Sequence, residues 1–532
     1  MNNLNNNRLN ILDLPDEILC LIIEKLNTVD VFYSLVNVNQ RFNRLVFDSL
    51  YIHDLNMRTI MNINSLYDQT SLIDPKVLSR ICKKILPGIH SHVHKLTVEE
   101  YSIKQILLAS NYPQLYSLSL INFQAETLYE YLTDNLILRD LLGKQIRHLN
   151  IDMKKTREQS SITVSKIFEL ILSLCKNLIV LNICDMFPTR KRLIQTLYIL
   201  RKNYTPSALT KLKINVPTLT ECLCLLDGPL VCLSTLIINV LCIYHPDMLQ
   251  AIDTTKKLPN LKCFSFTSFG HTYEYDNLIV PLLCRMINLE ELKLYLLVRR
   301  LDSTYIDGYQ LYDRFLIYMT QLKKFTFYIK TEVSFKTVRF ELPTNEDIQR
   351  SFIGRRYPRV TSYAYTQSVP FDGVCHIYSF PYDFEYFVDL DNSFQGGMFK
   401  KVRLLKMNDR IPFEHNFFEL ISQDFPFLEF LYIDNNYPQK DNQHSSTLIR
   451  FPYLTYLALE YTHVDCVKLF LLKQNMYLPR LLNLSIKYKS LIMITNNFTN
   501  DPTYFNFDQL KSLHLDESFV RPENFHQYLP LI

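Results

Sequence analysis

The 532-residue sequence has only nine glycines and only 21% charged residues, and both shortages exclude whole classes of protein. Loops that hold phosphate groups are built from glycines, and neither the P-loop pattern nor the glycine-rich dinucleotide pattern occurs. The metalloprotease and serine-hydrolase patterns are also missing, so we expect no catalytic residues and no enzyme. With 48% hydrophobic residues, the chain is too apolar to be mostly disordered. We therefore expect a folded protein that binds no cofactor.

Membrane spans, disulfide frameworks and a strong net charge are missing as well. No run reaches the roughly 18 consecutive apolar residues that a membrane span needs. The 57 Lys and Arg residues nearly balance the 53 Asp and Glu residues, which disfavours nucleic acid and anionic membranes as partners. The twelve cysteines are scattered, which indicates a reducing compartment, either the cytoplasm or the nucleus.

One run of histidines has to be considered as a metal site, namely His90, His92 and His94. Their alternation places three imidazoles on one face of a strand, too far apart to share one tetrahedral ion easily. The cysteines include no zinc-type pair separated by two residues. We therefore predict that the chain has no metal site.

The feature that is present is a repeat: an apolar residue, two others, an apolar residue, one other and an apolar residue. Units start at 115, 146, 178 and 209, which are 31, 32 and 31 residues apart. Later units start at 402, 428, 454, 481 and 510, which are 26, 26, 27 and 29 residues apart. Such regularity indicates one structural unit used many times. The first apolar residues of the units are Leu115, Ile146, Leu178, Leu209, Leu233, Leu261, Leu289, Leu322, Val402, Leu428, Leu454, Leu481 and Leu510, and Val93 is a possible earlier start.

Each unit is predicted to be a strand followed by a helix. The last two apolar positions are two residues apart, so they face the same side of a strand. The intervals hold apolar residues at helical spacing, such as Val164, Ile167 and Ile171. Stacked units of this kind resemble leucine-rich repeats, in which parallel strands line a concave face and helices lie outside. The alternative is an ordinary α/β domain with coincidental strands.

We assign residues 91–532 to this leucine-rich-repeat-like solenoid, with an irregular segment at about 330–400. Val360, Tyr363 and Tyr365 are a possible further unit in that segment. The remainder of the segment is predicted to be an insertion or loop, or else two degenerate repeats. The fold class is therefore α/β.

A different pattern precedes the repeats, at residues 11–57. Pro15 suits a helix start, where its missing N–H costs nothing. Apolar residues then recur at helical spacing, first from Ile18 to Leu26 and again from Phe42 to Val46. The pattern predicts three short helices, too small a unit to be stable alone. We expect residues 1–10 to be a disordered Asn-rich tail and residues 58–90 to be a helical linker or cap.

This segment resembles the F-box. The residues that fall on the family pattern are Leu14, Pro15, Glu17, Ile18, Leu19, Leu26, Val31, Val38, Arg41 and Phe42. The sequence departs from the pattern at Asn39, which replaces the usual Cys, at Gln40, and at Phe42, which replaces the usual Trp in a chain that has no tryptophan.

The resemblance implies that the segment binds the Skp-type adaptor of a cullin-RING (SCF-type) ubiquitin ligase. The implied adaptor-binding residues are Leu14, Pro15, Glu17, Ile18, Leu19, Ile22, Leu26, Val31, Leu35, Val38 and Phe42. Leu14 and Pro15 stand at an exposed helix start and are the natural residues to mutate. The alternative is that the helices only cap the first repeat.

In each unit, one residue lies between the last two apolar residues and another directly follows them. Both are predicted to face the open concave side of the sheet. Earlier units place Lys293, Tyr295 and Tyr328 there. Later units place Tyr432, Asp434, Glu460 and Asp516 there, an aromatic and acidic group suited to a basic protein segment.

The sequence therefore predicts a substrate receptor of a ubiquitin ligase, which holds an unidentified protein substrate while other subunits transfer ubiquitin. The first alternative is a leucine-rich-repeat interaction scaffold that is not attached to a ligase. The second is an enzyme with a site in residues 330–400.

Overall fold

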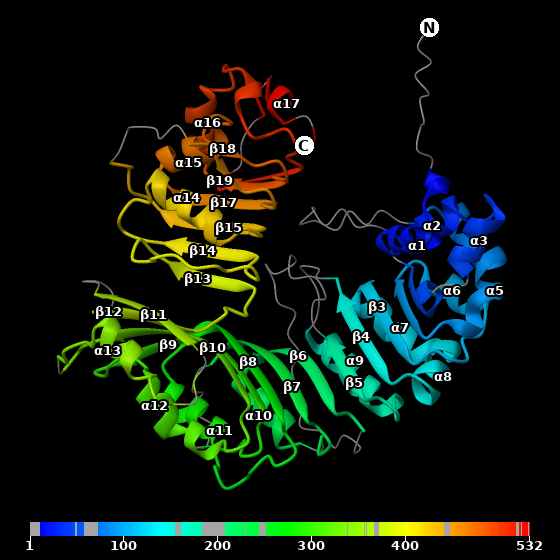
Figure 1. The fold of residues 1–532 in the computed structure, drawn as a ribbon, viewed down its shortest axis with the longest axis horizontal. Coiled ribbons are helices and arrows are strands. Elements are labelled where there is room, and N and C mark those ends of the chain that lie inside the picture. Colours follow the sequence, from blue (N-terminus) through cyan, green and yellow to red (C-terminus); the bar gives the residue numbers. More distant parts are fainter. Residues whose placement is uncertain are drawn as a thin grey trace. The chain divides into compact units, whose positions relative to one another are not determined.

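The protein is described here by a computed structural model in which the placed residues form two compact units. The described residues up to Ile238 form the first unit and those from Asn239 onward form the second (Figure 1). The expected tail at 1–10 and the beginning of the expected linker, 58–72, lie outside the described residues. The described residues are 11–47, 50–57, 73–154, 161–183, 208–228, 230–243, 252–337, 339–355, 357, 359–366, 372–440, 447–517, 521–522, 524–529 and 531.

Three helices open the first unit, as the apolar spacing predicts. They are α1 (Asp16–Lys25), α2 (Thr28–Ser34) and α3 (Gln40–Phe47). The side chain of Asn27 accepts a hydrogen bond from the N–H of Val29 at 2.8 Å and caps α2. Asn39 accepts one from the N–H of Phe42 at 2.7 Å and caps α3 in the same way.

Parallel strands follow the three helices in chain order. They are β1 (Asp54–Met57), β2 (Lys95–Glu99), β3 (Ser117–Phe123), β4 (His148–Met153), β5 (Val180–Ile183), β6 (Lys211–Thr218) and β7 (Thr235–Cys242). The register aligns the middle apolar residues of successive units, Leu118, Leu149, Leu181 and Leu212. The predicted units are therefore confirmed as neighbouring parallel strands. Strand β1 was not predicted, because its residues lie inside the segment 11–57 that was assigned to the N-terminal module.

Helices lie along one side of these strands (Figure 1). Beyond the first three they are α4 (Pro75–Arg80), the π-helix η3 (Ile81–Ile85), α5 (Leu86–Ile89), α6 (Ile103–Ala109), α7 (Ala125–Asp134), α8 (Leu136–Lys144), α9 (Ser161–Leu174) and α10 (Leu219–Leu226). Val164, Ile167 and Ile171 of α9 are buried, as their helical spacing predicts. The strand predicted at His90 and His92 is wrong, because both residues belong to the short 3-10 helix η4 (His90–His92).

The strands at the start of the second unit depart from the predicted parallel order. Strands β8 (Cys263–Thr272), β9 (Glu291–Leu301) and β10 (Lys324–Ser334) are parallel. However, β12 (Gly373–Phe380) runs antiparallel to β10, and β11 (Arg359–Thr366) runs antiparallel to β12. The possible further unit at Val360 lies on β11 and is therefore not a repeat. The helices are η6 (Tyr275–Ile279), α11 (Val280–Leu283), α12 (Gly308–Arg314), η7 (Leu316–Tyr318) and α13 (Asn345–Arg350).

A separate parallel sheet holds the later repeats. Its strands, in order, are β13 (Tyr386–Leu390), β14 (Leu404–Asn408), β15 (Phe430–Asn435), β17 (Tyr456–Thr462), β19 (Asn483–Ile486) and β20 (Ser512–Leu515). The register aligns the middle apolar residues Leu405, Leu431, Leu457, Leu484 and Leu513. The strand order breaks within the segment predicted to be irregular, because β13 starts a new sheet there, and a single solenoid over residues 91–532 stays a prediction.

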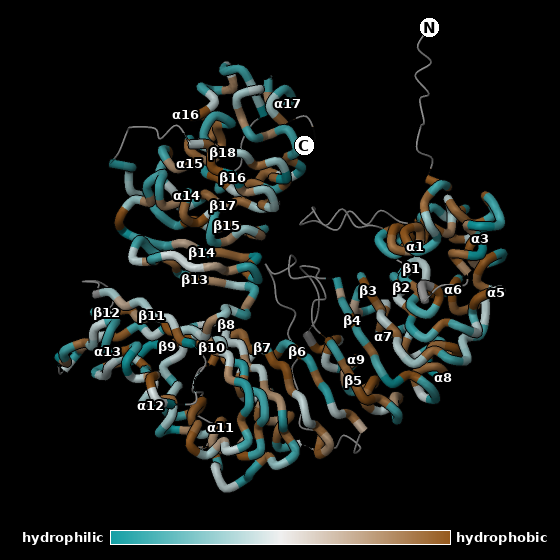
Figure 2. Tube along the Cα trace, in the orientation of Figure 1, coloured by the Kyte–Doolittle hydropathy of each residue, from teal (hydrophilic) through white to brown (hydrophobic). Residues whose placement is uncertain are grey.

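The remaining elements of this unit are short. Strands β16 (Ile449–Arg450) and β18 (Met476–Tyr477) form a parallel pair. The helices are α14 (His415–Asp424), α15 (Val464–Leu471), α16 (Tyr488–Thr495), η8 (Pro502–Tyr504) and α17 (Phe525–Tyr528). Figure 2 shows hydrophobic residues recurring along the strands and the helices, as expected for units that share a continuous core.

An aromatic core joins the two sheets of the second unit. Tyr295 and Tyr328 stack at 4.6 Å between ring centroids and are almost fully buried. The ring of Phe384 lies 5.3 Å from Tyr295, and the ring of Phe387 lies 5.3 Å from Tyr328. The prediction that both tyrosines face an open concave side is therefore wrong, because the segment leading into β13 packs over them.

Asp391, directly after β13, is a buried carboxylate in the same region. It is 3% exposed, and its Oδ1 accepts a hydrogen bond from the N–H of Ser393 at 2.7 Å. Burial raises the pKa of Asp391 to about 6, and the negative charge of Asp409 adds to the rise, whereas the Ser393 N–H opposes it. A carboxyl whose pKa is raised by folding stabilises the fold less once it is ionised, so its contribution declines as pH rises from about 4 to about 6.

We predict that Asp391→Asn stabilises the protein at pH 7.5 relative to the parent chain, by about 1–3 kcal/mol more than at pH 5. The amide keeps the acceptor for Ser393 and carries no charge. Denaturant unfolding of both chains at the two pH values measures the difference. Asp434→Asn, which removes the same charge from an exposed strand end, is the matched control. An equal effect of Asp391→Asn at both pH values would contradict the account.

Candidate functional site

The N-terminal helices expose an unusual number of large apolar side chains. Ile18 is 43% exposed, Leu26 47% and Val38 61%. Leu21 and Tyr33 are also exposed, although the sequence pattern did not select them. Their exposure could have been predicted from the sequence, because a short helix cannot bury apolar residues on every side. Exposed apolar residues at this density are typical of protein-interaction surfaces.

The predicted adaptor-binding residues fall into three groups by exposure. Pro15, Glu17, Ile18, Leu26 and Val38 are exposed, Leu14, Ile22 and Leu35 are half-buried, and Leu19, Val31 and Phe42 are buried inside the module. The buried residues hold the helices together. The exposed residues are the ones that a partner reaches without rearrangement of the module.

Arg41 fixes the chain where α1 begins. Its Nη2 donates to the carbonyl of Leu14 at 2.6 Å, and its Nε donates to Asp16 at 2.7 Å. Arg44 also pairs with Asp16. The hydrogen bond from Arg41, together with both positive charges, holds the pKa of Asp16 below its ordinary value. These contacts position Leu14 and the following proline on the surface of the module.

The module also packs against the start of the repeats. Helix α2 lies against β1 and against η3. Arg80, just before η3, donates to the carbonyl of Val36 at 3.2 Å, and its guanidinium lies 5.7 Å from the ring centre of Tyr33. The short helices are therefore supported by the first unit, as their small size requires.

Comparison with protein-family models gives a match to the F-box domain at residues 11–52. The chain is an F-box domain-containing protein. F-box domains are the adaptor-binding modules of SCF-type ligases and typically bind Skp-type adaptors. No curated protein matches the chain. No helix among the described residues of this F-box protein is both long and apolar enough to cross a membrane.

The four predicted substrate-binding residues lie in the second unit, on β15, on β17 and directly after β20. Asp434 and Asp516 are exposed, and Tyr432 and Glu460 are half-buried. The Tyr432 ring packs at 5.1 Å from that of Tyr456, and Glu460 accepts a hydrogen bond from the hydroxyl of Ser485. Asp516 accepts one from the N–H of Tyr488 at 2.9 Å.

Strand register brings different residues beside Asp434. It pairs with Asn408 on β14 and with Tyr461 on β17, because a bulge shifts the register of β15 and β17 by one residue. Tyr461 is 62% exposed. The sequence reading selected Glu460 at this position because a bulge leaves no signal in the apolar spacing.

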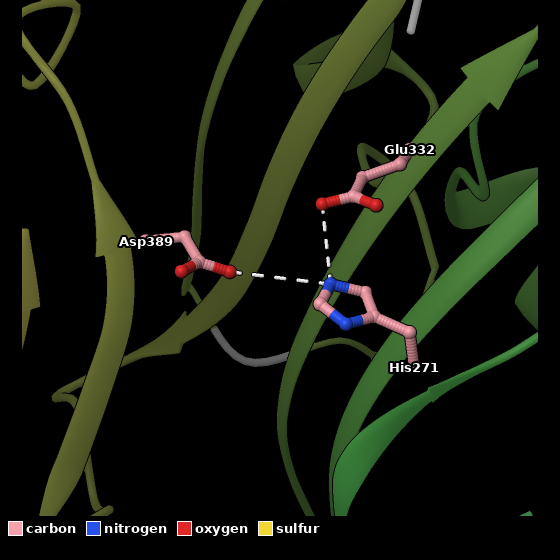
Figure 3. Close-up of side chains that lie close together, drawn as sticks. All are labelled: His271, Glu332 and Asp389. Atoms are coloured by element: carbon pink, nitrogen blue, oxygen red, sulfur yellow. Dashed lines mark hydrogen bonds and ion pairs between the residues drawn. The ribbon is translucent and has the colours of Figure 1, made fainter. Parts of the chain in front are cut away.

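The second unit also contains a potential metal-ligand set, His271, Glu332 and Asp389 (Figure 3). His271 Nε2 lies 3.1 Å from a carboxylate oxygen of Glu332 and 4.0 Å from one of Asp389. The residues come from β8, β10 and β13, so the set joins the two sheets. Sequence spacing gave no sign of it, because the three residues are far apart along the chain.

Basic side chains already occupy this set. Lys330 Nζ lies 2.6 Å from Glu332 and 2.9 Å from Asp389, and Arg299 Nε lies 2.8 Å from the other oxygen of Glu332. A divalent ion would have to displace the buried ammonium group from between the two carboxylates. The geometry therefore fits an ion-pair network better than a metal centre.

The pKa shifts in this network follow from its pairing. Burial alone would raise the pKa values of Glu332 and Asp389, but the charge and hydrogen bonds of Lys330, with His271 beside Glu332, outweigh it and lower both. Burial alone would lower the pKa of Lys330, but the two carboxylates outweigh it and raise it. The carboxylates therefore stabilise the fold above their unfolded pKa values of about 4, and this stabilisation is lost as pH falls below that range.

We predict that Lys330→Met destabilises the protein by about 3–5 kcal/mol near pH 7, because it removes the buried ammonium group that is the closest charged partner of both carboxylates. The loss should shrink toward pH 4, where the carboxylates of the variant take up protons. Adding Glu332→Gln and Asp389→Asn to the variant should recover most of the stability. Denaturant unfolding measures each step, with exposed Lys489→Met as the matched control. A small loss that does not change with pH would contradict the network.

Proposed function

We propose that this F-box protein is the substrate-recognition subunit of an SCF-type ubiquitin ligase. In this proposal the F-box binds the Skp-type adaptor, and the repeat region binds a protein substrate. The observation that carries it is the F-box match at residues 11–52, with exposed apolar side chains on the matched helices. Ubiquitin transfer would be carried out by other subunits, so the chain itself is not an enzyme. Its contribution is to raise the effective concentration of the substrate beside the transfer site.

We further propose that the repeat region is leucine-rich-repeat-like and serves as the binding surface. Parallel strands in repeat register, with helices on one side, support this interpretation. The substrate surface is proposed around Asn408, Asp434 and Tyr461, where an exposed carboxylate and an exposed aromatic ring are strand neighbours. A carboxylate beside an aromatic ring suits an Arg- or Lys-bearing segment, through an ion pair and a cation–π contact.

The cysteines support a proposal about the cellular compartment. Eleven cysteines fall within the described residues, and all of these are free thiols. Free thiols fit a reducing compartment, so we propose that the protein works in the cytoplasm or the nucleus, within the ubiquitin conjugation pathway.

A repeat scaffold without a ligase is the alternative function. The packing of α2 against β1 favours it, because these helices then serve as a cap for the first strand of the sheet. The two functions differ in what the exposed apolar residues of the F-box bind.

We predict that the full chain captures a purified Skp-type adaptor and that Ile18→Glu/Val38→Glu weakens capture at least about tenfold. Both side chains are exposed, so the variant should fold, which thermal unfolding checks. Leu136→Glu, an exposed apolar residue on α8, is the matched control and should bind as the parent does. Failure of the parent chain to capture the adaptor would favour the scaffold.

We also predict that the chain binds a fluorescein-labelled Arg-rich peptide and that Asp434→Lys/Tyr461→Ala weakens this binding about tenfold or more. Fluorescence anisotropy measures the dissociation constants. Glu130→Lys, on the exposed face of α7, controls for the change of net charge. Equal affinity of the parent and the double variant would rule out this surface.

A further inference from the structure

Arginines and aromatic rings meet where the strands of the second parallel sheet begin. Phe427 and Tyr453 each precede the first leucine of a repeat unit, and Arg480 occupies the same place in the next unit. The rings of Phe427 and Tyr453 lie 5.4 Å apart, and the guanidinium of Arg480 lies 5.2 Å from the ring centre of Tyr453. At the other end of the row, Arg403 lies 5.2 Å from the ring centre of Phe427. Repeat register therefore builds a row in which rings and cations are stacked.

A second arginine–tyrosine pair lies close in sequence to the first row, in the same two repeat units. Strands β16 and β18 align Arg450 with Tyr477, and the guanidinium lies 5.7 Å from the ring centre. Arg450 is three residues before Tyr453, and Tyr477 is three residues before Arg480. Arginine and tyrosine therefore alternate both along the chain and between neighbouring units. We call Arg403, Phe427, Arg450, Tyr453, Tyr477 and Arg480 the arginine–aromatic surface.

This surface is open to solvent. Phe427 is 36% exposed, Tyr453 38% and Tyr477 46%, and Arg450 and Arg480 are exposed. Rings that are held in place by cations lose little freedom when a partner covers them, which makes them effective contact residues.

The charges of the surface are only partly satisfied within the molecule. Arg403 pairs with Glu429 at 3.5 Å and donates to the carbonyl of Lys400 at 2.8 Å. Neither Arg450 nor Arg480 forms an ion pair with any residue in the described part of the chain. A guanidinium that lies over a ring still has N–H groups along its edge, and these suit a carboxylate in a two-bond arrangement.

We propose that the arginine–aromatic surface binds an acidic segment of a protein partner, with carboxylates on Arg450 and Arg480 and apolar groups against the tyrosine rings. Single-stranded nucleic acid fits less well. Bases stack on open ring faces, and here guanidinium groups lie over faces of Tyr453 and Tyr477. The carboxylate of Glu429, which pairs with Arg403, also interrupts the positive charge that a phosphate backbone would follow.

The arginine–aromatic surface is distinct from the proposed substrate surface around Asp434 and Tyr461. Those residues lie where the strands end and are suited to basic groups, whereas the arginine–aromatic surface lies where the strands begin and is suited to acidic groups. The proposal does not rest on the F-box, so loss of adaptor capture would leave it standing.

The test measures binding of a fluorescein-labelled copolymer of Glu and Tyr to the full chain, by anisotropy at low and high salt. We expect the copolymer to bind and its affinity to fall as the salt concentration rises. The double variant Arg450→Glu/Arg480→Glu should reduce the affinity at least about tenfold. The milder variant Arg450→Lys/Arg480→Lys should fall between, because lysine keeps the charge but loses the planar fork.

The control variant Lys468→Glu/Lys489→Glu makes the same change of net charge at two exposed helix positions of the second unit. It should bind the copolymer as the parent chain does. Thermal unfolding checks that each variant folds. The proposal is overturned if the parent chain does not bind the copolymer. It is also overturned if the arginine and the lysine double variants weaken binding equally. Tighter binding of labelled oligothymidylate through the same two arginines would overturn it in favour of nucleic acid.

Discussion

The two-residue spacing of the last two apolar positions in each repeat is the constraint on which the rest of the molecule depends. A slip of one residue would turn every apolar side chain of a strand to the opposite face, so burial fixes the register of neighbouring strands. Leu405, Leu431 and Leu457 show the result, because they align across β14, β15 and β17. Once the apolar residues of neighbouring strands are aligned, the polar residues that alternate with them along each strand are aligned too. The exposed residues at both ends of the strands therefore form rows that no single repeat could make.

The F-box depends on the same sheet in a different way. Three short helices have too few core positions to be stable alone, and here α2 packs against β1 and η3. This support leaves Ile18, Leu26 and Val38 exposed for a partner. The helices that carry the proposed adaptor surface and the first strands of the repeats therefore belong to one compact unit.

Sequence reasoning succeeded where local spacing decides the structure and failed where distant segments decide it. The helices of the F-box and the aligned leucines were predictable, because each follows from apolar spacing within about 40 residues. Tyr295 and Tyr328 were placed on an open face because nothing local shows that residues near Phe387 pack over them. The antiparallel pair β11 and β12, the bulge beside Asp434 and the Lys330 network likewise arise from contacts between distant parts of the chain.

The proposed function depends on attachment of this F-box protein to a ligase through its adaptor. Size-exclusion chromatography with light scattering, on the full chain mixed with a Skp-type adaptor and a cullin, tests it most directly. The account predicts a single complex that contains all three proteins and that loses the cullin when the adaptor is omitted. Separate elution of the full chain from an adaptor–cullin complex would contradict it and leave a repeat protein whose N-terminal helices only cover the first strand.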